Sequence, residues 1–418
     1  MRSALFLFFN YVVYLIQETL EGDFIKIRKY LLPLSFIYGL GVRFRNMLFD
    51  TEMLKSRSFT MPIISVGNIT VGGAGKTPHV EYLVRLLQDK VRVAVLSRGY
   101  KRRTKGYFLA DAGVTSREIG DEPYQMFLKY GKNIHVAVNA NRCEGIARLR
   151  YDKKTRDTDV ILLDDAYQHR YVKPGVNILL VDYHRLIVYD KLLPAGCLRE
   201  PKEGKRRADV VIVTKCPKDL RPMDFRVITK AMDLYPYQKL FFTTLNYMDI
   251  KPVYTETLNF SLKDLTPEHN ILVLTGIASP RHLLLDLQQY TQNIVPMSYS
   301  DHHQFTAKDV ARINNTFDAM PKKRIIITTE KDAARLINTD GLSNDVREHM
   351  YSLPIEISFM LDQGEQFDEF ILSYVHKNSK NSILSLRKNE EERAKRKNED
   401  SEDEPEANQH PVQQRISF

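Results

Sequence analysis

A glycine-rich segment near residue 70 contains the residue types and the spacing that bind nucleotide phosphates. Its end, Gly75-Lys76-Thr77, matches the last residues of a Walker A loop, although Thr70 stands where such loops usually begin with glycine. In such a loop, backbone N–H groups close on phosphate oxygens, Lys76 reaches the β- and γ-phosphates, and Thr77 offers a hydroxyl to Mg²⁺. We therefore predict a nucleotide site formed by Thr70, Val71, Gly72, Gly73, Ala74, Gly75, Lys76 and Thr77.

Two adjacent carboxylates follow a predicted strand. Residues 160–163, all Val, Ile or Leu, run directly into Asp164-Asp165. Because a P-loop enzyme needs a carboxylate at the end of a neighbouring strand to hold Mg²⁺, this pair fits a Walker B site. The residues also leave open the alternative that the two acids only cap a helix.

A third acid and a pair of histidines are further candidates. Asp121 lies directly before Glu122-Pro123, and an aspartate ahead of a helix-initiating proline is a common helix cap, so a structural and a catalytic role both stay open. His302 and His303 lie on a loop before a predicted helix. They could contact substrate, transfer a proton, bind a metal or be solvated, but no Cys/His cluster at zinc spacing supports the metal.

Basic side chains follow several predicted strands. Arg98, Arg102 and Arg199 could meet phosphates, because ligands of α/β proteins bind at strand ends. For the basic run 101–103, solvated surface charge remains the alternative. Residues 211–217 lack the Asn and the Asp of a guanine-recognising motif, which favours ATP over GTP.

Short β-branched runs alternate with helical stretches, a pattern typical of parallel sheets with crossover helices. We predict an α/β fold with a P-loop NTPase-like parallel sheet, helices on both of its faces, a second smaller α/β lobe and an N-terminal interfacial helix. The predicted strands are 63–66, 91–96, 160–163, 178–181 and 210–213 in the first lobe, and 271–274, 294–297 and 325–328 in the second. The predicted divisions are an apolar segment over 1–50, the P-loop domain over 51–245, the smaller lobe over 246–375 and a polar, disordered tail over 376–418.

The N-terminal region is apolar but does not predict a membrane span. Residues 4–16 form a run shorter than the roughly 20 residues of a spanning helix, and no small-residue cleavage site follows, so export is not expected either. A helix beginning at Pro33 is apolar except for a narrow stripe that contains Ser35, Arg43 and Asn46. With basic residues just before it, this helix is expected to lie in a membrane interface; packing against the protein core is the alternative.

Composition narrows the function classes. The 418 residues are 43% hydrophobic and 27% charged, which excludes wholesale disorder and a polytopic membrane protein. Three cysteines without a C-x-x-C pair support neither a disulfide framework nor a cysteine zinc site, and they indicate a reducing compartment. The net charge of +9 favours an anionic partner such as a phosphate ligand, a nucleic acid or a lipid surface.

Seven motifs, taken together and in order, resemble those of the tetraacyldisaccharide 4'-kinases of lipid A biosynthesis. They are V-G-N-I-T-V-G-G-A-G-K-T-P, S-R-G-Y, G-D-E-P, L-D-D-A-Y-Q-H-R, L-P-A-G-C-L-R-E-P, D-H-H-Q-F and T-T-E-K-D, and the resemblance covers roughly residues 30 to 375. It implies transfer of the γ-phosphoryl group of ATP, with Mg²⁺, to the 4'-hydroxyl of a tetraacyldisaccharide 1-phosphate, giving lipid IVA. It also implies a peripheral or monotopic protein at the cytoplasmic face of a Gram-negative inner membrane, with no nucleic-acid partner.

The resemblance further implies roles for single residues. Asp121 matches the family's catalytic base, His302 is expected to pair with it across a cleft, and Asp165 is a further catalytic carboxylate. Thr77 and Asp164 would hold the metal. The expected substrate contacts are Asn68, Arg98, Gln168, Arg199 and Glu200. The family commonly has glycine where this chain has Ala166.

Two other function classes are compatible with parts of the sequence. A P-loop GTPase or ATPase that acts as a switch or as a metal-insertion chaperone would explain the Walker A loop, but the guanine motif is missing. The hypothesis of a non-enzymatic protein that binds membrane surfaces does not explain the Asp164-Asp165 pair or the Gly-Lys-Thr loop.

Overall fold

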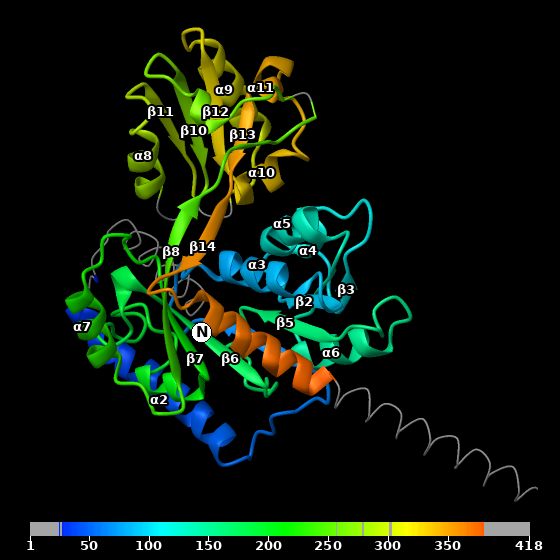
Figure 1. Ribbon diagram of the computed structural model, residues 1–418, viewed down its shortest axis with the longest axis vertical. Helices are drawn as coiled ribbons and strands as arrows, with labels where there is room; N and C mark the ends of the chain where they lie inside the picture. The colour runs from blue at the N-terminus through cyan, green and yellow to red at the C-terminus, as the bar shows by residue number, and fades with distance from the viewer. Residues whose placement is uncertain (1–24, 26, 256, 278–279, 301–302, 380–418) are drawn as a thin grey trace, which may run out of the picture.

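The computed structural model describes residues 25, 27–255, 257–277, 280–300 and 303–379. They form two α/β lobes, a larger one built on a mostly parallel sheet and a smaller one above it (Figure 1). The predicted α/β class is confirmed, and each predicted strand of both lobes is present.

The larger lobe has a nine-stranded sheet in the order β14-β8-β7-β6-β1-β5-β2-β4-β3. The strands from β8 to β4 are parallel, whereas β14 and β3 run antiparallel at the two edges. The parallel strands are mainly Val, Ile and Leu because both faces of the sheet are covered. The strands are β1 (Ile63–Gly67), β2 (Val93–Ser97), β3 (Phe108–Leu109), β4 (His135–Val138), β5 (Val160–Asp164), β6 (Val176–Asp182), β7 (Val210–Thr214), β8 (Lys239–Tyr247) and β14 (Ile355–Phe359).

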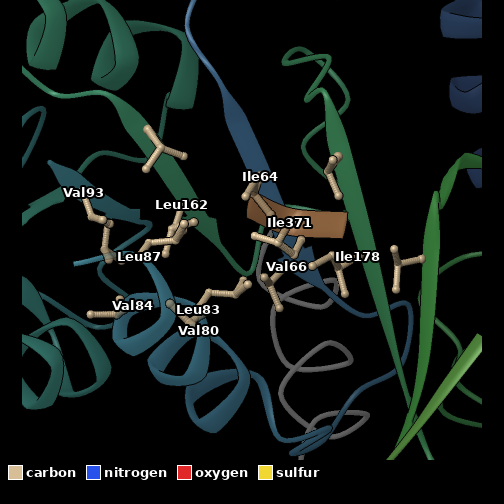
Figure 2. Close-up of a cluster of buried hydrophobic side chains, with 14 of the residues drawn as sticks. Ile64, Val66, Val80, Leu83, Val84, Leu87, Val93, Leu162, Ile178 and Ile371 are labelled. Carbon is tan, nitrogen blue, oxygen red and sulfur yellow. The ribbon is translucent and has the colours of Figure 1, made fainter. Parts of the chain in front are cut away.

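Helices cover both faces of this sheet, as predicted. The helices of this lobe that follow the P-loop are α3 (Lys76–Leu87), α4 (Ser116–Ile119), α5 (Asp121–Tyr130), α6 (Arg142–Tyr151) and α7 (Pro222–Met232). Apolar side chains of α3 and α5 pack on one face, and those of α6 and α7 pack on the other. Figure 2 shows Val80, Leu83, Val84 and Leu87 of α3 directed at side chains of the strands, among them Ile64 and Val66.

The smaller lobe is built on a five-stranded sheet in the order β11-β10-β12-β13-β9. Thr306 forms a capping box with Asp309 at the start of α9, and the Thr329 side chain accepts from the N–H of Asp332 at the start of α10. Its strands are β9 (Lys251–Pro252), β10 (Asn270–Thr275), β11 (Ile294–Ser298), β12 (Arg324–Thr329) and β13 (Met350–Leu353). Its helices are α8 (Arg281–Leu287), α9 (Ala307–Asp318), α10 (Glu330–Leu336) and α11 (Asn344–Glu348). Short 3₁₀ helices lie at Lys29–Leu31, Tyr183–Arg185, Lys202–Arg207 and Leu262–Asp264.

The chain crosses between the lobes twice. Strand β8 runs from the large sheet towards the smaller lobe, and β14 returns beside it as its antiparallel partner (Figure 1). A helix over residues 364–379 then packs on the large sheet, where Phe367, Ile371 and Val375 join the cluster of α3. The smaller lobe is therefore inserted between two parts of the larger one.

Helix α2 (Leu32–Asp50) lies on the surface of the larger lobe with Ser35 of its polar stripe turned inward, whereas Arg43 of the same stripe is exposed. Ser35 is buried, and its hydroxyl donates to the carbonyl of Leu192 (2.9 Å) and accepts from the N–H of Ala195 (2.9 Å). A side chain at Gly39 would come within 2.7 Å of Leu192, so glycine allows this close approach. Large apolar side chains of α2 are exposed instead: Leu32, Leu34, Phe36, Ile37, Tyr38, Leu40, Phe44 and Met47. Within the described part of the chain, no helix combines the length and the apolar character needed to cross a membrane.

Candidate active site

The P-loop connects β1 to α3. Gly75 has a left-handed backbone (φ 76°), which favours glycine, and Lys76 is the first residue of the helix. The Lys76 ammonium lies 3.5 Å from the side-chain oxygen of Asn68 and 3.4 Å from a carboxylate oxygen of Asp165. The backbone and the cation predicted to bind phosphates are thus held at the carboxyl end of β1.

Neighbouring segments fix the loop from two sides. On one side, the N–H of Val71 donates to the carbonyl of Cys197 (2.8 Å), and the N–H of Arg199 donates to the carbonyl of Ile69 (2.7 Å). On the other side, the hydroxyl of Thr214 at the end of β7 donates to the carbonyl of Ala74 (3.1 Å). The loop is therefore rigidly placed by the L-P-A-G-C-L-R-E-P segment and by β7.

A buried histidine, His79, forms a hydrogen bond to the backbone of the P-loop. The Nδ1–H of His79 donates to the carbonyl of Gly75 (2.7 Å), and its Nε2 lies 3.0 Å from the hydroxyl of Thr243 on β8. Burial lowers the pKa of His79 to about 4, so the ring is neutral at physiological pH. A neutral ring can accept from Thr243 while it donates to Gly75, and it ties the P-loop to the strand that leads to the smaller lobe.

The two predicted carboxylates lie beside the P-loop. Asp164 ends β5, the strand next to β1, and Asp165 follows with a positive φ of 47°. Burial and the neighbouring charge of Asp165 raise the pKa of Asp164 to about 6, although Lys76 opposes the shift. The Arg142 guanidinium donates to the backbone carbonyls of Asp164 (3.3 Å) and Asp165 (3.4 Å) and so holds this turn in place.

The donor set at this edge fits a magnesium ion. The carboxylate oxygen Oδ1 of Asp164 is buried and finds no hydrogen-bond partner among the residues described. Buried polar atoms are normally paired, so an unpaired carboxylate oxygen is suited to a cation. Carboxylate and hydroxyl oxygens are ligands that Mg²⁺ prefers, and Thr77 lies in the first turn of the adjacent helix.

Asp121 is not a helix cap in this structure. The N-cap residue of α5 is Gly120, whose φ of 93° favours glycine, and Asp121 is the first helical residue. A side chain at Gly120 would lie 2.9 Å from the carbonyl of Tyr100, so the G-D-E-P and S-R-G-Y loops touch backbone to backbone. Asp121 is buried, and one of its oxygens accepts from Nε (2.9 Å) and Nη2 (2.7 Å) of Arg335 in the smaller lobe.

The structure describes only one of the two adjacent histidines, His303. His302 lies outside the residues that the structure describes. His303 lies 2.9 Å from a carboxylate oxygen of Asp309 and stacks on the ring of Tyr299 with 4.6 Å between centroids. His303 therefore belongs to the packing and capping of α9.

The residues expected to contact substrate have different environments. Asn68 is fully buried and donates to Thr70 (3.1 Å), while Arg98 is exposed after β2. Gln168 and Arg199 are partly exposed near α2, because the carbonyl of Gln168 accepts from Arg45 and that of Arg199 accepts from Tyr38. The Glu200 side chain is 2% exposed and pairs with Arg207 at 2.8 Å.

Two arginines at this site were missed by the sequence analysis. Arg142 begins α6 after the strand β4. Arg335 lies on a capped helix three residues after Asp332 and forms an ion pair with it at 2.8 Å. The signals were present in principle, since strand ends and i,i+3 charge pairs are recognisable patterns. Neither pattern shows which distant carboxylate or carbonyl an arginine will meet.

Comparisons with known proteins agree on one family. The family model for tetraacyldisaccharide-1-P 4'-kinase matches residues 27–376. Relatives named tetraacyldisaccharide 4'-kinase, from Phocaeicola vulgatus and Bacteroides fragilis, are 55% and 50% identical over 367 and 373 residues; each alignment covers 88% of this chain and 100% and 99% of the relative. A crystal structure of LpxK from Aquifex aeolicus in complex with ATP is 29% identical with a TM-score of 0.63, and the match covers 83% of this chain and 99% of that one.

Proposed function

The chain belongs to the tetraacyldisaccharide 4'-kinase family, and from that premise we propose how its residues carry out the reaction. It binds ATP and phosphorylates tetraacyldisaccharide 1-phosphate in lipid A biosynthesis. The observation that supports the residue assignments is the meeting of the P-loop and the Asp164-Asp165 pair at one sheet edge, near which α5 begins with Asp121. The start of α5 meets the loop that follows β2, the strand next to β5, because a side chain at Gly120 would lie 2.9 Å from the carbonyl of Tyr100.

The nucleotide binds over the P-loop. Residues 70–77 direct backbone N–H groups at the phosphates, and Lys76 exchanges its contacts with Asn68 and Asp165 for the β- and γ-phosphates. Because Lys76 is already held at the loop by these two side chains, little ordering is needed when ATP arrives. Phosphoryl transfer depends mainly on such positioning and on charge stabilisation.

Thr77 and Asp164 would hold Mg²⁺ beside the phosphates. A bound Mg²⁺ neutralises charge that develops on the β- and γ-oxygens. Asp164 must be ionised for this role, and Asp165, released from Lys76 when ATP binds, supplies a further carboxylate at the site.

Asp121 accepts the proton of the 4'-hydroxyl. A sugar hydroxyl is a weak nucleophile, and a carboxylate that orients it in line with the γ-phosphorus and takes its proton late suits a loose transition state. His302 would pair with Asp121, as the family resemblance implies. Arg98 and Arg199 supply cations for the anionic acceptor.

The acceptor carries acyl chains, and α2 offers them a route from a lipid surface. Its exposed face includes Phe36, Ile37 and Phe44, which are 63%, 65% and 59% exposed. An apolar face of this size in water is unfavourable, whereas a helix lying in a membrane interface buries it. We place α2 in the headgroup region of the cytoplasmic leaflet of the inner membrane.

The residue assignments are tested by a kinase assay on the full-length protein in detergent. ATP, Mg²⁺ and tetraacyldisaccharide 1-phosphate are supplied, and mass spectrometry follows the gain of one phosphoryl group. We expect Lys76→Ala to abolish transfer, and Asp121→Asn and His302→Ala each to lower kcat by about 10²-fold with the KM for ATP little changed.

Matched controls are Lys90→Ala at the far end of α3 and Asp157→Asn, both at exposed positions. They should keep wild-type kcat. An Asp121→Asn enzyme with full activity would remove the proposed base, and Lys76→Ala activity within about tenfold of wild type would contradict the P-loop assignment.

A further inference from the structure

A buried ion pair joins the catalytic carboxylate to the smaller lobe. Arg335 of α10 donates from Nε (2.9 Å) and Nη2 (2.7 Å) to the same oxygen of Asp121, and the two side chains are only 3% and 8% exposed. Two donors in a fixed plane hold a carboxylate in one orientation, which a single flexible ammonium does not. The orientation of Asp121 thus depends on a residue 214 positions away in the chain.

Arg335 is itself held rigidly. Its third nitrogen, Nη1, donates to Asp332 (2.8 Å), whose side chain is fully buried. The other oxygen of Asp332 accepts from the N–H of Gly276 (2.8 Å) and from the hydroxyl of Thr329 (2.7 Å). Arg335 is therefore fixed to β10, β12 and α10, the framework of the smaller lobe.

We propose that Arg335 is a positioning residue for the reaction, which orients Asp121 towards the acceptor hydroxyl and assembles the base only when the smaller lobe is seated against α5. This role rests on the proposed function of Asp121 as the base. Arg335 does not touch the reacting atoms; it acts through Asp121. It couples seating of the smaller lobe to phosphoryl transfer and leaves ATP binding at the P-loop largely unaffected.

The charges around Asp121 determine how the pair responds to pH. An arginine in hydrogen-bond contact favours the ionised carboxylate, so its removal leaves Asp121 next to other acids with less compensation. The acid limb of the kcat–pH profile should therefore move to higher pH when the charge at position 335 is removed. Besides Arg335, the charged groups on the elements packed around Asp121 are Glu122 and Lys129 on α5, Glu330, Lys331 and Asp332 on α10, and Arg117 and Glu118 on α4. The loop after β2, which touches Gly120, adds Arg98, Lys101, Arg102 and Arg103.

The test uses the full-length enzyme with ATP, Mg²⁺ and the lipid acceptor in detergent. We expect Arg335→Met to lower kcat at least about tenfold while the KM for ATP stays within about twofold, and to move the acid limb upward by about one pH unit. Arg335→Lys keeps the charge but cannot make the same three bonds, so its kcat should lie between those of Arg335→Met and wild type, with the acid limb unshifted.

Tyr124→Phe is the matched control. It removes a hydrogen bond between α5 and the turn that follows α10, from Asn338 to the Tyr124 hydroxyl (2.9 Å), without touching Asp121. This variant should keep kcat within about twofold of wild type. An equal loss in Tyr124→Phe and Arg335→Met would mean that any weakening of the lobe contact is sufficient, and would overturn the specific role of Arg335.

The remaining outcomes separate this inference from the assignment of the base. If Asp121→Asn is inactive but Arg335→Met folds and keeps wild-type kcat and pH profile, the base stands and the positioning role is wrong. If Asp121→Asn is active, the base fails and the positioning role fails with it. Should Arg335→Met not fold, Arg335→Lys decides: a lower kcat at unchanged KM for ATP supports the proposal, and wild-type kcat overturns it.

Discussion

Two carboxylates and one ammonium set the charge balance beside the P-loop. Lys76 lies 3.4 Å from Asp165, while the partly buried Asp164 is the preceding residue, and Arg142 donates to its backbone carbonyl. Burial and then the charge of Asp165 raise the pKa of Asp164, and the charges of Lys76 and Arg142 offset this shift only in part. A divalent cation would restore the balance, which gives the magnesium assignment a physical basis at the level of single residues.

This balance predicts that magnesium binding is linked to protons. Because Asp164 has a pKa of about 6 and must be ionised to bind Mg²⁺, affinity should fall as pH falls through 6. Calorimetry in buffers of different ionisation enthalpy should show about half a proton released per ion at pH 6 and almost none at pH 8. Asp164→Asn should abolish this proton release. A release that does not vary with pH would contradict the role of Asp164.

At the scale of one element, α2 reverses the usual arrangement of a surface helix. Ser35 and Gly39 face the protein, whereas most of its large apolar residues face outward and only Phe49, near its end, is buried among them. Surface helices of soluble proteins normally bury the apolar stripe. Close docking through Ser35 fixes which side of the helix faces outward, so the apolar face is presented as one continuous surface.

We expect the double variant Phe36→Glu/Ile37→Glu to bind vesicles containing anionic lipid much more weakly than the wild type. Each buried aromatic or aliphatic side chain contributes about 1.5–3 kcal/mol, so the loss should exceed about 3 kcal/mol, or roughly a hundredfold in partitioning. Co-flotation with vesicles measures it. Tyr151→Glu, at an exposed position on α6, is the control and should bind like wild type. Unchanged flotation of the double variant would argue against α2 as the membrane contact.

At the scale of the whole molecule, the two lobes are joined by the β8–β14 pair and by charged contacts between α5 and α10. Besides Arg335 with Asp121, Lys331 pairs with Glu122 at 2.9 Å. A further triad joins three helices, because Lys129 of α5 contacts both Glu81 of α3 and Glu330 of α10. Such pairs depend on a close and specific fit of the lobes, since an uncompensated buried charge is costly.

Lys129→Met should destabilise the protein by about 3 kcal/mol at neutral pH, because the side chain of Glu81, 2% exposed, loses its cation. Burial already raises the pKa of Glu81. In the variant this carboxyl can take up a proton as pH falls, so the destabilisation should be smaller at pH 5 than at pH 7.5. Urea unfolding at the two pH values measures both effects.

Lys154→Met is the control for this experiment. It breaks an ion pair with Asp111 in which both side chains are mostly exposed, and the unfolding midpoint should not change. A Lys129→Met variant as stable as wild type at both pH values would show that the triad does not stabilise the fold.

The sequence by itself determined the features that depend on local spacing. The Walker A loop, the strands with their apolar runs and the N-caps at Thr306 and Thr329 each follow from residues within one short segment. Of the polar stripe predicted on α2, Ser35 is buried but Arg43 is exposed, so spacing alone did not determine which side of the helix faces the protein. The resemblance of seven motifs to the kinase family then predicted the reaction, phosphoryl transfer from ATP to a lipid acceptor.

Only the tertiary structure decided which distant groups meet. Asp121 could be read as a helix cap until its bond to Arg335 was seen, and the buried pair of Glu200 with Arg207 was not foreseen. The sequence also did not predict that β14 and residues 364–379 return to the large sheet. The physical reason is that a hydrogen bond or ion pair depends on ångström-scale distances, which arise from packing elements far apart in the chain, whereas periodicity and capping are set by neighbours along it.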